Sequence, residues 1–391
     1  MNGKVGVTWS LEPHTEAKHE ILRYYLGAWF PIIATIKPSW FPTLGTTKRR
    51  LLYVDGFAGP GEYEGGKDGS PIIALKVAKD HKLRDRLQRP DVELVFYFIE
   101  KDNARFQNLE LKLAGLQLPA NFRIEKECKS FEDAFGSALS EIEEQSKHLA
   151  PSFVFIDPFG PTGFSMSLIR RLAQQRSSEV LITFNYQALN QWFLNDPSKY
   201  KRLDELYGGG VWRQALRTSV PSQKESYLME AYENELKSLG WKVRPFRMIN
   251  KYNQTQYYLF FATSNPLGML AMKRAMWRAA PVGDFKYSDL TNPQQPRLFD
   301  KELYDEEYSR DLANQLYQYN KGRTVYKQDL LKADAAWHPV CIERHLTRAL
   351  KILECESTPP KVINVEVPNR KRRGKTYPDD CTITFAPESA K

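Results

Sequence analysis

The segment that most constrains the fold is residues 53–61, YVDGFAGPG, in which an apolar strand runs directly into a turn with three glycines. Gly56, Gly59 and Gly61 let the backbone turn tightly and approach a ligand, because glycine has no Cβ atom. Their G-x-x-G-x-G spacing is the reverse of the G-x-G-x-x-G of NAD-binding folds. The turn therefore predicts a ligand of nucleotide type at the end of a strand, and it does not meet the dinucleotide fingerprint.

The apolar pattern of the first three quarters of the chain alternates between strands and helices. The expected strands lie at 51–55, 93–100, 122–127, 152–157, 179–185, 242–249 and 257–263, and the expected helices at 15–29, 70–79, 104–114, 131–145 and 165–175. This alternation predicts an α/β fold with a Rossmann-like, seven-stranded sheet that is largely parallel and doubly wound. A helical insertion is expected around 190–235. In such sheets a ligand binds beyond the carboxyl ends of the strands.

Composition and charge limit the functional classes. The chain has 391 residues, 42% of them apolar, and a net charge of +9. No apolar run approaches the roughly 20 residues of a membrane span, and no secretion signal opens the chain, so we expect a cytoplasmic protein without membrane contact. The four cysteines have no C-x-x-C spacing, so no metal site is expected. The basic runs at 48–50 and 370–375 predict contacts with nucleic-acid phosphates, and a solvated charged surface is the alternative for either run.

Glu100 ends the second expected strand. A carboxylate at this place accepts both hydroxyls of a ribose in NAD sites and in S-adenosylmethionine sites. The position therefore indicates a nucleoside without identifying it. A strand that ends in an acid by chance is the alternative.

Residues 157–160, DPFG, end the fourth expected strand. They resemble the Asp/Asn-Pro-Pro-aromatic motif of methyltransferases that act on exocyclic amino groups, and more closely the Asp-Pro-Phe-Gly form of tRNA guanine-N2 dimethyltransferases. The Asp157 carboxylate and the Pro158 carbonyl would accept the two N–H groups of an aromatic amine and make its nitrogen more nucleophilic, while Phe159 would stack on the base. The alternative is a strand that ends in a tight Pro-Gly turn.

The methyltransferase resemblance implies S-adenosylmethionine as the cofactor. Its methionyl part would lie against Asp55 and the glycine turn, its ribose against Glu100, and its adenine near the next two residues. Ser130 follows the third expected strand, whose tip lacks the acid usual in related folds. Lys18 lies on a helix that folds over the cofactor in many such enzymes, and a solvated helix face is its alternative. The expected cofactor-binding residues are Lys18, Asp55, Gly56, Phe57, Ala58, Gly59, Gly61, Glu100, Lys101, Asp102, Ser130 and Asp157.

The expected substrate pocket also includes residues beyond the fifth strand. Asn185 and Tyr186 follow that strand, and with Gly160 they are expected to line the pocket. Core packing is the alternative for Tyr186, because buried aromatic side chains usually serve packing.

Residues 300–391 predict a separate module. Its expected elements are helices at 308–319, 326–332 and 340–354 and strands at 362–367 and 382–385. Three helices followed by a hairpin are typical of a winged helix, and a winged helix used for protein contact is the alternative. Nucleic-acid contacts are expected from Arg344, Arg348, Lys351, Arg370, Lys371, Arg372 and Arg373.

Segments at 14–29, 53–63, 69–71, 155–160 and 257–263 are together similar to the three-Cys-motif partner proteins, and the resemblance covers roughly residues 9–280. Those bacterial proteins are named for a genomic neighbour that carries a three-cysteine cluster of the kind that holds an iron–sulfur centre. The resemblance implies a protein partner and supplies no reaction.

Two functions remain open. In the first, residues 1–285 form a methyltransferase that uses S-adenosylmethionine and modifies an exocyclic amino group of a base in DNA or RNA, while the C-terminal module docks the nucleic acid. In the second, the chain is a non-catalytic nucleic-acid-binding partner of the three-cysteine protein and keeps the cofactor fold as a scaffold or sensor. The DPFG motif favours the first function, and the missing acid at the third strand favours the second.

Overall fold

The computed structural model describes residues 7–35, 48–280, 285–290 and 298–388. The chain divides into two compact units. Unit 1 comprises Met1–Ser264 and Lys286–Thr291, and unit 2 comprises Asn265–Phe285 and Asn292–Lys391. The first unit was expected to run to residue 285, whereas the structure groups the helix α10 (Pro266–Ala279) with unit 2.

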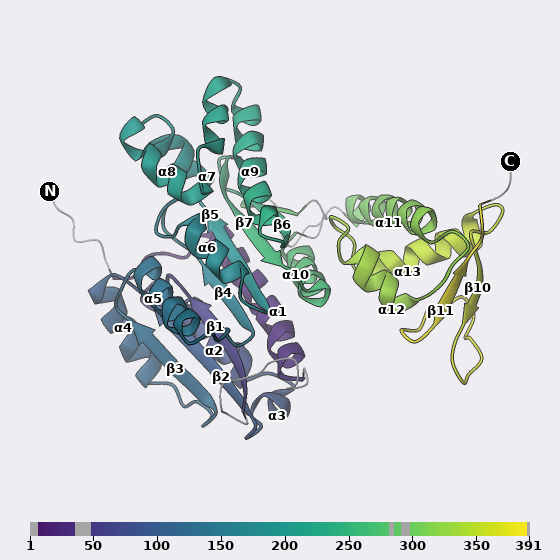
Figure 1. The fold of residues 1–391 in the computed structure, drawn as a ribbon, viewed down its shortest axis with the longest axis horizontal. Helices are drawn as coiled ribbons and strands as arrows, with labels where there is room; N and C mark the ends of the chain where they lie inside the picture. Colours follow the sequence, from purple (N-terminus) through teal and green to yellow (C-terminus); the bar gives the residue numbers. More distant parts are fainter. Residues whose placement is uncertain (1–6, 36–47, 281–284, 291–297, 389–391) are drawn as a thin grey trace. The chain divides into compact units, whose positions relative to one another are not determined.

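Unit 1 is built on one eight-stranded sheet in the order β3-β2-β1-β4-β5-β7-β6-β8 (Figure 1). Strands β1 to β5 pair in parallel, β7 is antiparallel to both β5 and β6, and β8 is parallel to β6. The strands are β1 Arg49–Asp55, β2 Val92–Ile99, β3 Phe122–Glu127, β4 Ser152–Ile156, β5 Ser178–Phe184, β6 Lys242–Ile249, β7 Thr255–Thr263 and β8 Lys286–Ser288. All seven expected strands are present. The expectation of seven was one short, because the three residues of β8 carry no apolar run.

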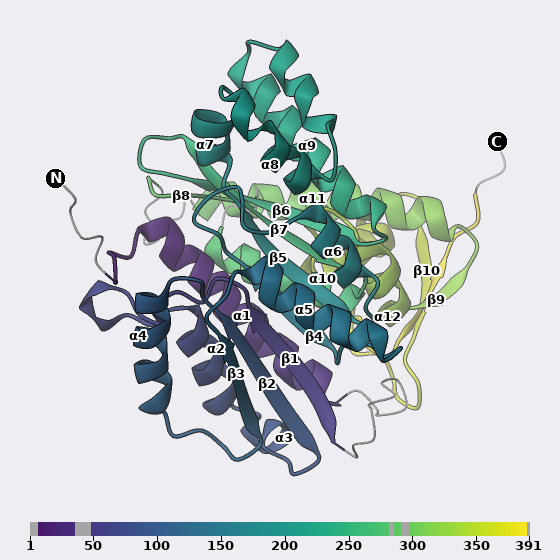
Figure 2. The ribbon, with the colours of Figure 1, turned by 60° about the vertical axis from the view of Figure 1, so that its left-hand side comes forward.

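Helices cover both faces of this sheet, which confirms the Rossmann-like, doubly wound prediction (Figure 2). Side chains alternate between the two faces along each strand. Tyr53 and Phe153 belong to the aromatic layer on the α1 side, whereas Val54 and Val154 pack into the core cluster with α5 and α6. The helices of unit 1 are α1 Pro13–Thr35, α2 Ser70–Lys79, α3 Arg84–Leu87, α4 Asn103–Ala114, α5 Phe131–Glu144, α6 Met166–Ala173, α7 Tyr186–Ala188, α8 Tyr200–Tyr207 and α9 Pro221–Ser238.

Helix α1 is fixed to the sheet by one aromatic residue. Tyr25 donates a hydrogen bond of 2.5 Å to Glu179 at the start of β5. Its ring lies 4.7 Å from that of Phe153 and 5.1 Å from that of Phe261, measured between centroids. These contacts place the middle of α1 beside the amino end of β5, and a bond from Lys18 to Asp157 places its first turns at the carboxyl end of β4.

The expected helical insertion is present as α8 and α9. Tyr207 of α8 and Tyr232 of α9 are buried against the ring of Phe184 on β5. The insertion therefore adds to the core of unit 1.

Unit 2 consists of helices and a three-stranded sheet of order β10-β11-β9. Its further elements are α11 Leu298–Asn320, β9 Thr324–Tyr326, α12 Lys327–Leu330, α13 Glu343–Lys351, β10 Val362–Glu366 and β11 Thr382–Phe385. The three expected helices and two expected strands are present, and β9 was missed because it is only three residues long. Inside this unit, the buried Lys273 of α10 donates hydrogen bonds to the carbonyl oxygens of Ala335 and His338, at 2.7 and 3.0 Å.

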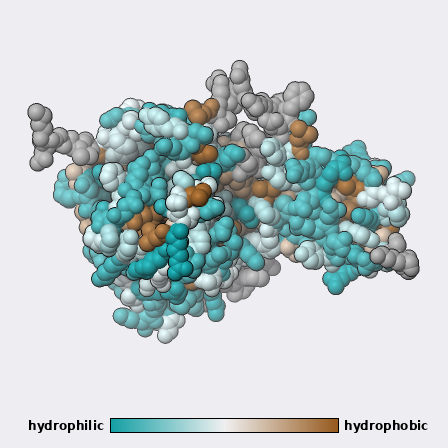
Figure 3. Space-filling view, turned by 90° about the horizontal axis from the view of Figure 1, so that it is seen from above, coloured by the Kyte–Doolittle hydropathy of each residue, from teal (hydrophilic) through white to brown (hydrophobic). Residues whose placement is uncertain are grey.

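The surface of the described chain is mainly polar. Figure 3 shows one face on which hydrophilic side chains dominate and hydrophobic ones are scattered among them. Among the described residues, no helix combines the length and apolar character needed to cross a membrane. The same residues contain no cluster of three side chains suited to hold a metal ion.

Candidate active site

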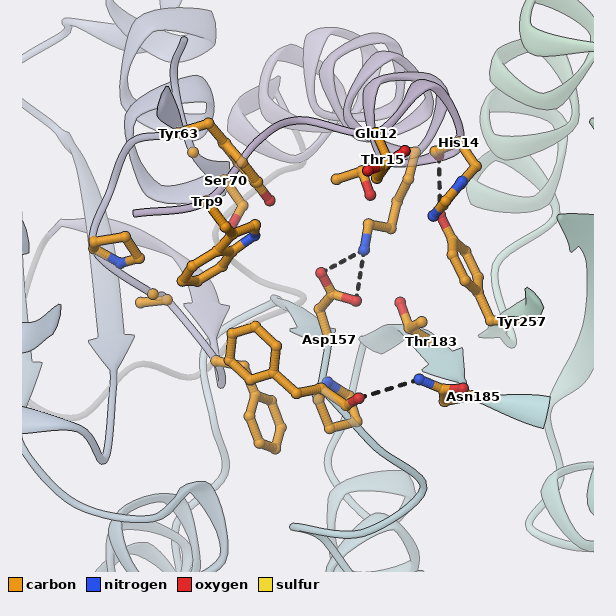
Figure 4. Close-up of a pocket in the computed structure, with 18 of the residues that line it drawn as sticks. Trp9, Glu12, His14, Thr15, Tyr63, Ser70, Asp157, Thr183, Asn185 and Tyr257 are labelled. Atoms are coloured by element: carbon orange, nitrogen blue, oxygen red, sulfur yellow. Dashed lines mark hydrogen bonds and ion pairs between the residues drawn. The ribbon is translucent and has the colours of Figure 1, made fainter. Parts of the chain in front are cut away.

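A cavity of about 260 Å³ lies at the carboxyl ends of the strands of unit 1 (Figure 4). It is lined by the start of α1 with the residues before it, the glycine-rich loop after β1, the start of α2, and residues at the ends of β4, β5 and β7. The two sequence motifs expected to form one site, 56–61 and 157–160, both contribute to this lining. A parallel sheet explains this, because it brings the carboxyl ends of β1 and β4 to the same edge.

The glycine loop has the close-packed backbone that its sequence predicts. Gly59 and Gly61 have φ of 62° and 80°, a region that favours glycine. Gly69 donates a hydrogen bond of 2.8 Å to the carbonyl of Gly61, and a Cβ atom on Gly69 would lie 2.9 Å from the Gly61 carbonyl carbon. Of the expected loop residues, those that line the cavity are Phe57, Ala58, Gly59 and Gly61. Gly56 is not among the lining residues, and it packs against the ring of Phe131.

Asp55 lies behind this loop and does not line the cavity. Its carboxyl is fully buried and accepts hydrogen bonds from the Tyr53 hydroxyl at 3.3 Å and the Phe57 N–H at 3.4 Å. Burial raises the pKa of this carboxyl to about 7, and a hydrogen bond with Ser70 acts against that rise. The structure thus assigns Asp55 to the support of the loop.

Glu100 also holds the loop. Its carboxylate is buried and accepts the backbone N–H groups of Gly59 at 2.9 Å and Asp102 at 2.8 Å. The Asp102 side chain caps α4, Ser130 caps α5, and Lys101 is exposed. None of these four residues lines the cavity, so the structure does not gather the expected ribose and adenine contacts there.

The central polar contact of the cavity joins α1 to the end of β4. Lys18 Nζ lies 2.7 Å from Oδ1 and 2.6 Å from Oδ2 of Asp157. The Lys18 side chain is 6% exposed and that of Asp157 is 19% exposed. The ammonium also lies 5.2 Å from the ring centroid of Tyr257, whose hydroxyl donates to the carbonyl of His14. The sequence predicted both Lys18 and Asp157 as site residues, but it did not predict the ion pair between them.

The next residue of α1 is a neutral histidine. His19 is buried, and its ring lies 5.4 Å from that of Tyr63 in an edge-on arrangement. Burial, followed by the charge of Lys18, lowers the pKa of His19 to about 3. His19 is therefore uncharged at neutral pH and adds no positive charge beside Asp157.

One rim of the cavity is a cluster of two rings and a guanidinium. Trp9 and Phe159 meet edge to face with centroids 5.1 Å apart. The guanidinium carbon of Arg105 lies 4.9 Å from the Trp9 centroid and 4.7 Å from the Phe159 centroid. Phe159 is still 55% exposed, which leaves ring surface for stacking. Trp9 and Arg105 were missed in the sequence, where nothing marks their approach to the DPFG motif.

The expected substrate residues divide into two groups. Asn185 lines the cavity and caps α7. Its side chain donates a hydrogen bond of 3.1 Å to the carbonyl of Phe159, so it holds the DPFG turn in place. Pro158 lines the cavity as well. Tyr186 is buried in the hydrophobic core, which agrees with its packing alternative, and Gly160 is not a lining residue. Other lining residues that sequence reasoning missed are Thr183, Gln256 and Tyr257, which lie near the ends of β5 and β7 that face the cavity.

The basic residues expected to bind nucleic acid lie in unit 2, and several are paired with acids. Arg344 pairs with Asp305 at 2.9 Å, and Arg348 pairs with Glu306 at 2.7 Å and with Glu356. Two further pairs, both at 2.7 Å, are Arg370 with Asp380 and Arg372 with Glu354.

The other expected basic residues of unit 2 are Lys351, Lys371 and Arg373. All three are exposed, and no ion pair holds them within the described part of the chain.

Comparisons with known proteins add little to this geometry. No protein-family model matches the chain, and no curated protein matches it. Three solved structures illustrate the likenesses that exist. A proposed methyltransferase from Porphyromonas gingivalis W83 is 9% identical, with a TM-score of 0.25 over 60% of this chain and 40% of that one. A DUF574 family protein from Streptomyces avermitilis is 12% identical, with a TM-score of 0.32 over 64% and 83%. The geranyl diphosphate C-methyltransferase of Streptomyces coelicolor A3(2), solved with S-adenosyl-L-homocysteine, is 11% identical, with a TM-score of 0.24 over 57% and 74%. At these values the likenesses carry no argument about function, and the fold of unit 1 rests on its own strand order.

Proposed function

We propose that the chain is an S-adenosylmethionine-dependent methyltransferase that acts on an exocyclic amino group of a nucleic-acid base. The observation that carries the proposal is that one cavity joins the glycine loop after β1 to Asp157, Pro158 and Phe159 after β4. The strand order of unit 1, with β7 reversed between β5 and β6, is that of a methyltransferase sheet and supports it.

The residues around the loop fit S-adenosylmethionine. The bound cofactor supplies an activated methyl group on a sulfonium, so the protein has mainly to orient donor and acceptor and exclude water. Gly59, Gly61 and Ser70 present a closely approachable surface for the methionyl part. Glu100 holds the loop in this form by accepting the backbone N–H groups of Gly59 and Asp102.

Asp157 and the Pro158 carbonyl have the acceptor groups that an aromatic amine needs. Hydrogen bonds from the amine to these oxygens shift electron density to the nitrogen and favour attack on the methyl group. In this proposal Lys18 fixes the orientation of the Asp157 carboxylate, because its ammonium contacts both oxygens.

Unit 2 supplies the nucleic-acid contact in this proposal. We propose that it is a winged helix, since α11, α12 and α13 are followed by the β10–β11 hairpin, and β9 completes the sheet. The exposed Lys351, Lys371 and Arg373 are the candidate phosphate ligands, because the neighbouring arginines are already ion-paired.

One observation favours the second function. Lys18 engages both oxygens of Asp157, and the expected adenine contacts do not line the cavity. A non-catalytic partner of a three-cysteine protein would need neither a free Asp157 carboxylate nor adenine contacts in the cavity. This candidate predicts that no methyl group reaches DNA or RNA even when the partner is present.

The experiment that separates the two functions uses the full chain. Calorimetry with S-adenosylmethionine is followed by transfer of labelled methyl groups to total tRNA and to genomic DNA, with mass spectrometry of the nucleosides. We expect cofactor binding, transfer to an amino group, and loss of transfer in Asp157→Ala, which removes the acceptor oxygens, with binding retained. The control is Asp91→Ala, which removes a carboxylate that pairs with Arg89 just before the amino end of β2, away from the cavity. Absence of cofactor binding, or full transfer by Asp157→Ala, would overturn the proposal.

A further inference from the structure

Thr183 carries a buried hydroxyl that has no partner. The residue is 3% exposed and is next to last in β5. Its Oγ1 accepts and donates no hydrogen bond within the described residues, yet the residue lines the cavity. An unsatisfied buried polar group costs about 1–3 kcal/mol, and folded proteins retain few of them. A buried hydroxyl without a hydrogen-bond partner beside a cavity indicates a ligand that supplies the missing hydrogen bond.

The register of the sheet determines which face the hydroxyl occupies. Thr183 lies opposite Leu259 in the antiparallel pair of β5 and β7, so it shares a face with Tyr257, two residues from Leu259. That face is covered by α1, because the Tyr257 hydroxyl donates to the His14 carbonyl and the ring of Tyr25 packs on Phe261. The hydroxyl therefore lies under the first turns of α1, and Figure 4 shows Thr183 near Asp157.

This position is on the acceptor side of the proposed site. The glycine loop follows β1, whereas Asp157 follows β4 and Thr183 lies on β5, the next strand away from β1. On the adjacent β7, Gln256 also lines the cavity, and its Oε1 accepts from Asn250 at 3.2 Å, which leaves its NH₂ group as a donor. The cavity thus offers the hydroxyl of Thr183 and, from β7, the amide of Gln256 to a polar molecule.

We infer that Thr183 is a specificity-determining residue whose hydroxyl binds the ring nitrogen next to the target amino group of a nucleobase. The inference rests on the proposed function and names the part of the substrate that is recognised. Adenine, cytosine and guanine each have a ring nitrogen adjacent to the carbon that bears the amino group. A threonine hydroxyl both donates and accepts, so it can pair with a bare nitrogen or with an N–H. A site built around such a bond rejects a ligand that lacks the partner, because the buried group is then left unsatisfied.

The test uses the full chain saturated with S-adenosylhomocysteine, and calorimetry with AMP, CMP and GMP as probes, each compared with its analogue in which the ring nitrogen beside the amino-bearing carbon is replaced by C–H. We expect the wild type to bind at least one of the three nucleotides about tenfold more tightly than its C–H analogue, the effect of one buried hydrogen bond. Thr183→Val keeps the shape of the side chain and should abolish this preference. Thr183→Ser restores the hydroxyl and should retain it.

The control variant removes a similar hydroxyl from another place. Tyr232 also has a buried hydroxyl without a partner, but it lies in the hydrophobic core and does not line the cavity. Tyr232→Phe should therefore leave the nucleotide preference unchanged. S-adenosylhomocysteine should bind all variants within about twofold of the wild type, since Thr183 lies on the acceptor side.

The outcomes separate the inference from the proposed function. Failure of the wild type to bind S-adenosylmethionine and S-adenosylhomocysteine would defeat the proposed function and the inference together. Cofactor binding with equal affinity for each nucleotide and its C–H analogue, or with the same preference in Thr183→Val as in the wild type, would overturn the inference alone. The second of these results is the one expected if a water molecule is the partner of the hydroxyl.

Discussion

Lys18 and Asp157 are 139 positions apart in the chain, and a single ammonium nitrogen lies within 2.7 Å of both oxygens of the carboxylate. The contact links the helix that covers the sheet to the motif that ends β4. A partly buried ion pair of this kind contributes modestly when complete, but removal of one partner leaves the other charge poorly solvated. The pair therefore connects the stability of unit 1 to the geometry of its cavity.

Lys18→Met retains the aliphatic part of the side chain and removes the charge. We expect a loss of about 1–3 kcal/mol in the free energy of unfolding, because the Asp157 side chain is 19% exposed and would lose its counter-ion. Methyl transfer should fall at least about tenfold, because the carboxylate is no longer oriented. Urea denaturation and the transfer assay measure the two effects.

The matched control is Lys67→Met. Lys67 pairs with Glu16 at 2.9 Å, but both side chains are more than half exposed. Exposed pairs contribute less than about 1 kcal/mol, so this variant should resemble the wild type. Equal behaviour of the two methionine variants would contradict the role assigned to Lys18.

Asp55→Asn should change how stability depends on pH. Burial raises the pKa of the Asp55 carboxyl from 3.8 to about 7, so between these values the folded chain holds a proton that the unfolded chain has released. The Asp55 contribution therefore makes the fold less stable as the pH rises through this window. We expect the free energy of unfolding of the variant to rise relative to that of the wild type by on the order of 2–4 kcal/mol between pH 4 and pH 8, since one pKa unit corresponds to about 1.4 kcal/mol. Denaturation at pH 4, 6 and 8 checks this, and a difference that does not change with pH would count against it.

The sequence was sufficient to predict the main sheet and the neighbourhood of its two motifs. Seven apolar runs became β1 to β7, and the carboxyl ends of β1 and β4 meet because parallel strands share an edge. Partners of single side chains were not predictable, because they depend on tertiary contacts. Glu100 has the expected position, but the fold turns the loop over it so that its carboxylate binds backbone N–H groups.

Unit 2 illustrates the same limit. Its basic residues and the acidic stretch at 300–311 are both visible in the sequence. Only the packing of α11 on α13 places Asp305 and Glu306 against Arg344 and Arg348. The order of charged residues in a sequence therefore predicts a basic surface poorly, because packing in the folded chain decides which basic residues are paired with acids.

Gly69→Ala tests the close packing of the loop. The new Cβ atom would lie 2.9 Å from the Gly61 carbonyl carbon, a backbone atom that can move only if the loop shifts. We expect a loss of about 1–3 kcal/mol in stability, as for other overpacked sites, together with weaker S-adenosylmethionine binding. The control is Gly136→Ala inside α5, where the nearest atom is 3.9 Å away and alanine should be neutral or stabilising by about 0.5–1 kcal/mol. Unchanged cofactor affinity in Gly69→Ala would argue that the cofactor does not contact the loop.

The last prediction concerns which cations of unit 2 reach nucleic acid. Lys371 is exposed and belongs to no ion pair among the described residues, whereas Arg348 pairs with Glu306 and Glu356. Release of counter-ions makes each phosphate contact lower the slope of log affinity against log salt by about 1. Lys371→Ala should therefore make that slope less negative by about 1 and weaken binding of DNA or RNA without loss of stability. Arg348→Ala should leave the slope unchanged and destabilise unit 2 by about 0.5–1.5 kcal/mol, because two carboxylates lose a shared partner. Fluorescence anisotropy over 50 to 300 mM salt (about 14 to 6 Å of screening length) measures the slopes, and a larger change of slope in Arg348→Ala than in Lys371→Ala would refute this assignment.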